Sequence, residues 1–170
     1  MTEERSVLRH SLVPSLLDVL EYNRKRKAED VRLFELGKRY SLSEEVELVS
    51  GVLTGNCQES TWQGKHDPFD FFAAKGILEA LFSALSVKNV RYVKPARTNG
   101  MLHPGVVAEL FVGERRIGIL GKLHPNVASV RDLPDTYVFR RGMTRQKLVQ
   151  DMQAAQAELL EELWAKRAAV

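Results

Sequence analysis

The hydrophobic positions near the amino terminus first follow a helical period. Apolar residues recur three or four positions apart, which is the spacing of one buried helix face. They are Val13, Leu16, Leu17 and Leu20. Ser11 is a candidate cap for this helix, and Pro14 falls in the first turn, where the missing N–H of proline costs nothing. The pattern predicts a helix over residues 13–27.

The period then changes to two. In residues 31–40, Val31 and Leu33 fall on one side and Phe34 and Leu36 on the other. This alternation is typical of a strand. A short polar turn separates this run from a second strand-like run at residues 46–55. Two strands joined by a short turn predict an antiparallel hairpin.

The rest of the chain predicts one more strong helix and a set of strands. Residues 70–86 form the most amphipathic stretch, with its expected apolar side at Phe72, Ile77, Leu78, Leu81, Phe82 and Leu85. Strand-like runs follow at 89–95, 106–112, 115–125 and 133–139, with a hairpin turn expected at Gly113. Helix-favouring composition begins at Met143, so the change near Arg140 is a candidate boundary. The simplest arrangement is an α+β fold, an open antiparallel sheet with helices on one side.

Composition narrows the class of protein. The 170 residues are 44% hydrophobic and 28% charged, which is typical of a single globular domain rather than a disordered chain. No apolar run approaches the roughly 18 residues that cross a bilayer, and the charged start lacks the apolar core of a secretory signal. The formal net charge of +3 is too small to indicate a nucleic-acid partner by itself. One cysteine, Cys57, fits a reducing cytoplasm.

Signatures of catalytic and metal sites are missing from the residue pattern. The four histidines are scattered without ligand spacing, so we expect no metal site. His103 and His124 each precede a proline, and we expect each ring to orient a turn by a hydrogen bond. Cys57 lacks an identifiable base and is interpreted as a packing residue. There is no glycine-rich phosphate loop, and we assign no catalytic residue.

Four consecutive basic residues at the end of the first predicted helix are the candidate binding site. Arg24, Lys25, Arg26 and Lys27 carry charges that complement the negative end of a helix dipole. A solvated helix end is therefore the favoured interpretation. The alternative is contact with RNA phosphate or with a partner subunit, for which Arg24 and Lys27, three apart, are expected to face the same side. A continuous basic surface joining them to Arg140, Arg141 and Arg145 would favour RNA.

Several motifs together resemble one protein family. "EERSVLRHSLVPSLLDVLEYNRKRKAEDVRLFELG", "GVLTG", "WQGK", "DFFAAKGILEALFSAL", "LHPGVVAELFVGERRIGILGKLHPNV" and "LPDTYVF" occur in one order from about Glu3 to Phe139. This order is similar to the synthetase-like core of the phenylalanyl-tRNA synthetase β subunit of bacteria, in its Gram-positive variety. His10 stands in place of the threonine, and Ser15 in place of the glycine, that the family would lead us to expect.

The resemblance implies a class II synthetase-like antiparallel sheet flanked by helices, in a domain over residues 1–139. It also implies a domain without catalytic activity. A catalytic class II domain would carry an arginine that binds ATP just after the run that ends at Tyr40, and this sequence has Ser41 there. No cofactor is then expected in this chain, since ATP and Mg²⁺ would bind the α subunit. The implied partners are that α subunit and, as a second candidate, tRNA(Phe), and the implied location is the cytoplasm.

Residues 140–170 have no counterpart in the family and are expected to form a helical extension. Family β subunits are several times longer than this chain, so a fragment, a truncated product and a stand-alone RNA-binding or regulatory paralogue remain alternatives. An enzyme with a site of unfamiliar pattern is a further alternative.

Overall fold

The computed structural model describes residues 9–40, 45–57, 68–98 and 100–142. These residues form a six-stranded sheet in the order β1-β2-β6-β5-β4-β3, and each printed strand pair is antiparallel. The α+β fold class predicted from the sequence is confirmed. The strands are β1 (Val31–Tyr40), β2 (Glu45–Thr54), β3 (Val90–Val93), β4 (Leu102–Val112), β5 (Arg115–Leu123) and β6 (Thr136–Gly142).

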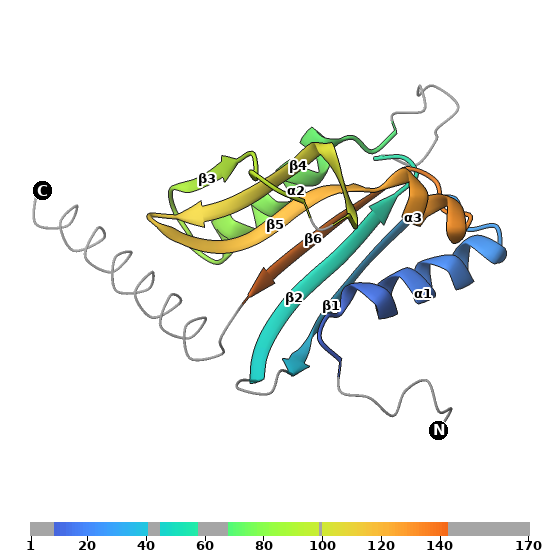
Figure 1. The fold of residues 1–170 in the computed structure, drawn as a ribbon, viewed down its shortest axis with the longest axis horizontal. Coiled ribbons are helices and arrows are strands. Elements are labelled where there is room, and N and C mark those ends of the chain that lie inside the picture. The colour runs from blue at the N-terminus through green and yellow to red at the C-terminus, as the bar shows by residue number, and fades with distance from the viewer. Residues whose placement is uncertain (1–8, 41–44, 58–67, 99, 143–170) are drawn as a thin grey trace, which may run out of the picture.

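Helices lie on both faces of the sheet, so the expectation of helices on one side is wrong (Figure 1). The helix α1 (Val13–Lys25) and the short α3 (Pro125–Val130) belong to one face, and α2 (Phe71–Ala84) covers the other. We call these the α1 face and the α2 face. Successive strand residues point to opposite faces, so β1, β2 and β6 each supply side chains to both.

The α1 face buries its core under the first helix. Four apolar residues of α1 pack against the sheet, among them Leu20, which is fully buried. Their partners on the sheet include Val31, Val52 and Val138. Arg131, just after α3, lies 2.6 Å from Asp18 of α1, which ties the two helices of this face together.

The α2 face buries a second apolar cluster. Ala74, Leu78 and Phe82 of α2 pack with Val49, Leu53, Leu110, Leu120, Tyr137 and Phe139 of the sheet. Asp70 caps the helix, because its carboxylate accepts a hydrogen bond from the Ala73 N–H at 2.7 Å. Phe72 and Ile77, expected on the buried side, are instead 74% and 40% exposed. The buried stripe is narrower than the apolar pattern indicated.

All three helices within the described residues end in the same motif. The residue after each cap has positive φ, at Lys27 (65°), Ser86 (53°) and Asp132 (50°). At α1, the Lys27 N–H donates to the Arg24 carbonyl at 2.8 Å, and the Ala28 N–H donates to the Asn23 carbonyl at 3.2 Å. This is the Schellman arrangement, here without the glycine that favours it. The first helix therefore ends at Lys25, not at Lys27 as predicted.

Other local predictions have mixed outcomes. Leu12, not Ser11, is the amino-terminal cap of α1, although the Ser11 hydroxyl accepts a hydrogen bond from the Val13 N–H at 3.3 Å.

The hairpin turn at Gly113 is confirmed between β4 and β5, with φ of 58°. β6 continues through Gly142, past the predicted domain end at residue 139. The predicted helix over residues 143–170 lies outside the described residues.

Candidate binding surfaces

Three of the four basic residues at the end of α1 contact their own helix or the residues just after it. The Arg24 guanidinium donates to the carbonyls of Ala28 and Glu29 at 3.0 and 3.3 Å. Lys25 lies 2.7 Å from the Glu21 carboxylate, one helical turn away. The Arg26 guanidinium lies over the Tyr22 ring, 3.4 Å from its centroid. These contacts account for the local role of the residues as a helix end.

Arg24 and Lys27 do not share a helix face. Lys27 follows the helix in the left-handed conformation, so the three-residue spacing that assumed a continuous helix does not apply. The expectation that both side chains face one partner strand is therefore wrong in its geometry. Contact of this junction with RNA or with a subunit remains a prediction.

The basic residues of β6 do not extend that surface. Arg140 and Arg141 are consecutive in a strand, so they point to opposite faces of the sheet. Arg141 is only 7% exposed and its guanidinium lies 5.1 Å from the centroid of the Phe82 ring, on the α2 face. Arg145 lies outside the described residues. A continuous basic surface that includes Arg141 is thus excluded by burial.

An apolar strip on β1 is the exposed feature that sequence analysis left without a role. Phe34 and Leu36 are 74% and 67% exposed, although they lie opposite Gly51 and Val49 in the register of the hairpin. Both therefore point to the α2 face, beyond the part of it that α2 covers. We call Phe34 and Leu36 the β1 strip. Strand alternation had placed both on one side, but it could not tell that no described helix covers them.

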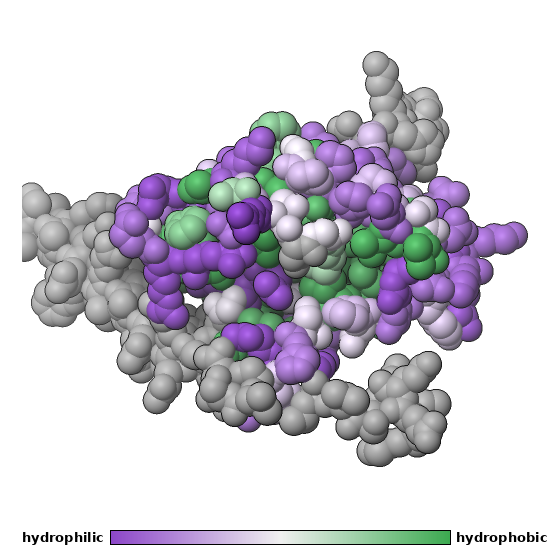
Figure 2. Space-filling view, viewed as in Figure 1, coloured by the Kyte–Doolittle hydropathy of each residue, from purple (hydrophilic) through white to green (hydrophobic). Residues whose placement is uncertain are grey.

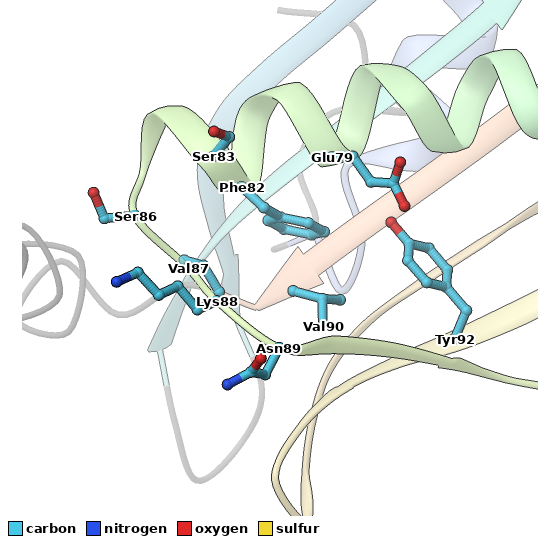
Figure 3. A pocket seen from close by; sticks show the side chains of 9 residues that line it. All are labelled: Glu79, Phe82, Ser83, Ser86, Val87, Lys88, Asn89, Val90 and Tyr92. Carbon is cyan, nitrogen blue, oxygen red and sulfur yellow. The ribbon is translucent and has the colours of Figure 1, made fainter.

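A hollow of about 440 Å³ lies between the end of α2 and β3. Figure 3 shows Glu79, Phe82 and Ser83 of α2 on one side and Val90 and Tyr92 of β3 on the other. The connecting residues, including Ser86 and Asn89 at positive φ, close one end. The hollow is lined by mixed polar and apolar side chains rather than by a convergent set of reactive groups.

Tyr92, which lines this hollow, has a shifted pKa. Burial, with a smaller contribution from the Glu79 charge, raises the pKa of Tyr92 to about 12. Its hydroxyl is buried without a hydrogen-bond partner among the described residues. The Lys75 ammonium lies 3.4 Å from the Glu79 carboxylate and 4.8 Å from the Tyr92 ring centroid. Its positive charge therefore offsets the negative charge of Glu79. A neutral phenol beside a paired carboxylate offers no general base.

The predictions that His103 and His124 each orient a turn are confirmed. The His103 Nδ1 accepts a hydrogen bond from the Gly105 N–H at 3.0 Å, and the His124 Nδ1 accepts one from the Asn126 N–H at 3.2 Å. Each ring therefore orients the turn at the following proline. Among the described residues, no group of three or more His, Cys, Asp or Glu side chains could hold a metal ion. Cys57 is half-buried and packs against the α2-face cluster.

Comparison with known proteins places this geometry in a family. Residues 1–140 match the family model for the phenylalanyl tRNA synthetase beta chain CLM domain. A phenylalanine--tRNA ligase beta subunit of Geobacillus kaustophilus is 45% identical over 150 residues, which are 85% of this chain and 18% of that protein. The corresponding subunit of Bacillus subtilis is 41% identical over 146 residues, 82% of this chain and 18% of that protein.

The fold comparison agrees. A solved structure of the pyrrolysyl tRNA synthetase PylSc from Desulfitobacterium hafniense matches with a TM-score of 0.61 at 12% sequence identity. The match covers 84% of this chain and 50% of that structure, and it supports a class II synthetase-type fold. Within the described part of the chain, no helix is long and apolar enough to cross a membrane.

The chain spans about a fifth of the length of the curated relatives that it matches. The match to the family model covers most of the chain. The chain therefore belongs to the family of the phenylalanyl-tRNA synthetase β chain CLM domain.

Proposed function

We propose that this chain acts as a non-catalytic, synthetase-like core that packs against the α subunit of a phenylalanine–tRNA ligase and supports the charging of tRNA(Phe) in the cytoplasm. The observation that carries this proposal is the family match over residues 1–140, together with 45% identity to a phenylalanine--tRNA ligase beta subunit. In this proposal the α subunit supplies the chemistry, and the sheet described above supplies a rigid docking surface.

The residue pattern supports a silent domain. A catalytic class II domain places an arginine after its β1-like strand to hold the ATP α-phosphate, and this sequence has Ser41 there. Such a domain also needs a glycine-rich strand before its last helix, whereas β6 reads TYVFRRG. Without cations aimed at the phosphates, the main source of transition-state stabilisation is missing. ATP and Mg²⁺ are accordingly assigned to the α subunit.

The β1 strip is the surface that we assign to the α subunit. Two large apolar side chains more than two-thirds exposed on one strand face are costly in water and are typical of a protein interface. Ile77 of α2 is a third exposed apolar residue, at 40% exposure. It lies on the flank of α2 opposite Lys75 and Glu79, which face β3, so this flank is turned toward β2 and β1.

A domain replacement tests the proposal. Residues 1–140 of this chain would replace the matching segment of the Geobacillus kaustophilus β subunit, and the chimera would be expressed with its α subunit. We expect an assembled enzyme that charges tRNA(Phe). A chimera that folds, as judged by circular dichroism, but leaves the α subunit unbound would contradict the proposed role.

Matched variants of the chimera locate the interface. Phe34→Ser with Leu36→Ser is expected to weaken assembly with the α subunit by about tenfold or more, because interface aromatics carry much of the binding energy. The control is Phe72→Ser, since Phe72 is also 74% exposed but lies on the outer side of α2. Equal weakening of assembly in both variants, or no weakening in either, would show that the β1 strip is not part of the interface.

A further inference from the structure

The carboxyl end of β6 lies close to the β1 strip. Gly142, the last residue of β6, pairs with Leu48 of β2, and Leu48 pairs with Gly37 of β1. Neighbouring strands are about 4.8 Å apart, so Gly142 lies about 10 Å from Gly37 across the sheet. Gly37 directly follows Leu36 in the chain. Residues 143–170 therefore start next to the strip.

The direction of β6 sends a returning segment along the strip. β1 and β6 each pair antiparallel with β2, so these two strands run in the same direction. A segment that folds back from the end of β6 thus runs against β1. It passes Leu36 first, then Phe34 and Arg32.

The α2 face is the open side of the hairpin for such a segment. On the other face, α1 packs against Val31 and Val52, so that side of β1 and β2 is already covered. On the side of the molecule that Figure 2 shows, hydrophilic residues gather over β4, β5 and the end of β6. The β1 strip is thus an exposed apolar surface within reach of residues 143–170.

The sequence of residues 143–170 has the pattern of an amphipathic helix. Apolar residues recur three or four positions apart, which is the spacing of one helix face. They are Leu148, Met152, Ala155, Leu159 and Leu163, and we call them the C-terminal stripe. An isolated helix of this length is marginal in water, so it depends on packing of its apolar face. From its first to its last residue the stripe spans about 22 Å in a helix, enough to cover the strip.

The charges of the two partners are complementary in this orientation. Arg32 shares the side of β1 that carries the strip, and its guanidinium donates to the carbonyls of Asn56 and Cys57 at 2.9 and 2.8 Å. These acceptors are neutral, and among the described residues no ion pair engages Arg32. Arg32 lies about 16 Å along β1 from Gly37, a distance that about 11 helical residues cover. A returning helix therefore brings three acidic residues to this end of β1, namely Glu158, Glu161 and Glu162.

We propose that residues 143–170 form a helix whose C-terminal stripe packs on the β1 strip when the α subunit is absent. The inference rests on the proposed function, because it makes this segment a competitor for the surface that we assign to the α subunit. The exposed side chains of the strip and the apolar face of the segment both gain by leaving water, and the end of β6 brings them together. The α subunit then binds only after the segment has left the strip.

Hydrogen exchange of the full chain alone, followed by mass spectrometry, tests the docking. We expect the amides of residues 148–163 to exchange at least about tenfold more slowly than in an unfolded peptide. Phe34→Ser with Leu36→Ser, and separately Leu159→Ser, should each remove most of this protection. Unchanged exchange of β2 and β6 in the same spectra shows that each variant is folded. Fast exchange of residues 148–163 in the parent, or protection that the β1 variant leaves unchanged, would overturn the proposal.

Leu160→Ser is the matched control for Leu159→Ser. The two changes remove the same side chain and alter helix propensity equally, but successive residues of a helix point about 100° apart. Leu160 therefore lies off the C-terminal stripe, and its loss should change the exchange rates by less than about twofold. Equal effects of the two changes would contradict docking by the stripe. Protection that grows with protein concentration would assign the segment to a second copy of the chain and overturn the proposal.

Affinity for the α subunit separates this inference from the proposed function. The full chain would be titrated with the Geobacillus kaustophilus α subunit. Leu159→Ser should bind it about tenfold more tightly than the parent, because no segment has to be displaced. Equal affinities of the parent and the variant would overturn the competition. Absence of binding by both proteins, with slow exchange of residues 148–163 in the parent, would contradict the proposed function and support the docked segment.

Discussion

The two faces of the sheet are built alike beneath their helices and differ where the helices stop. Each face has an apolar cluster under one long helix, built from Leu and Val on the α1 face and from aliphatic and aromatic residues on the α2 face. Beyond α1 the sheet carries Arg39, Arg116 and Arg140, whereas beyond α2 it carries Phe34 and Leu36. The same alternation of residues thus supplies core under each helix and leaves charged side chains beside one helix and apolar side chains beside the other.

This difference separates two kinds of surface within one domain. Exposed apolar side chains suit a protein partner, because burying them releases water. The charged side chains beyond α1 include an ion pair, since Arg116 lies 2.9 Å from the Glu109 carboxylate. The two faces therefore carry different side chains beside their helices, apolar on the α2 face and charged on the α1 face.

The largest expected effect tests whether the two clusters are equivalent. Leu20 of α1 is fully buried and Leu78 of α2 is 2% exposed, so each Leu→Ala change should lower the free energy of unfolding by about 2–5 kcal/mol. Chemical denaturation of the two variants measures this. Ile77→Ala is the control and should cost far less, because Ile77 is 40% exposed. A small loss at only one of the two leucines would show that the faces contribute unequally.

Alkaline unfolding sharpens the comparison on the α2 face. The pKa of Tyr92 is raised to about 12, so the folded state favours the neutral phenol. That contribution is complete below the ordinary pKa of about 10 and is lost as the pH rises from there to about 12. Tyr92→Phe should therefore lose less stability than the parent chain over this pH range. The variant should still lose some stability, because burial also raises the pKa of Tyr137. An equal fall in unfolding free energy with pH for the parent and the variant would contradict the role of Tyr92.

The ends of the helices give a smaller effect, of about 0.5–1 kcal/mol. Lys27→Gly should stabilise the chain by that amount, because a left-handed residue with a side chain is strained and glycine is not. Asp132→Gly should gain less, since Asp tolerates this conformation better than Lys. Thermal unfolding of the two variants measures the gain. Destabilisation by Lys27→Gly would show that the lysine side chain, not the backbone, ends α1.

The smallest effect on stability concerns the basic junction. Arg24→Gln with Lys27→Gln should lower the unfolding free energy by less than about 1 kcal/mol, since only the Arg24 bonds to two carbonyls are lost. If the junction contacts RNA phosphate, the same change should reduce the salt dependence of RNA affinity by roughly one to two units of slope. Arg91→Gln with Lys94→Gln, on the β3 side, is the matched control. Equal slopes for the parent and the Arg24/Lys27 variant would leave the junction as a solvated helix end.

The sequence pattern was sufficient for most strands and for the existence of the long helices, because burial on one face imposes a period. It was not sufficient for the end of α1, because Lys27 takes the left-handed position that glycine normally signals. It also misplaced Phe72 and Ile77, since an apolar residue on a helix does not reveal how far the sheet extends beneath it.

Exposed positions were harder to predict than core. Phe34 and Leu36 look like core in the strand pattern, and only the position of α2 leaves them exposed. Arg140 looked like part of a basic run with Arg141, whereas the strand sends the two to opposite faces. The surroundings of both sets of residues depend on strand order, which no local pattern contains. β6 lies between β2 and β5 in the sheet although it is the last described strand in sequence.

Phenylalanine-dependent ATP–pyrophosphate exchange is the most direct test of the central claim, that this domain supports catalysis without performing it. The chain alone should remain at background at every concentration, while the chimera assembled with the α subunit should exchange at the rate of its parent enzyme. Exchange above background by the chain alone, abolished by a point mutation within it, would contradict the account.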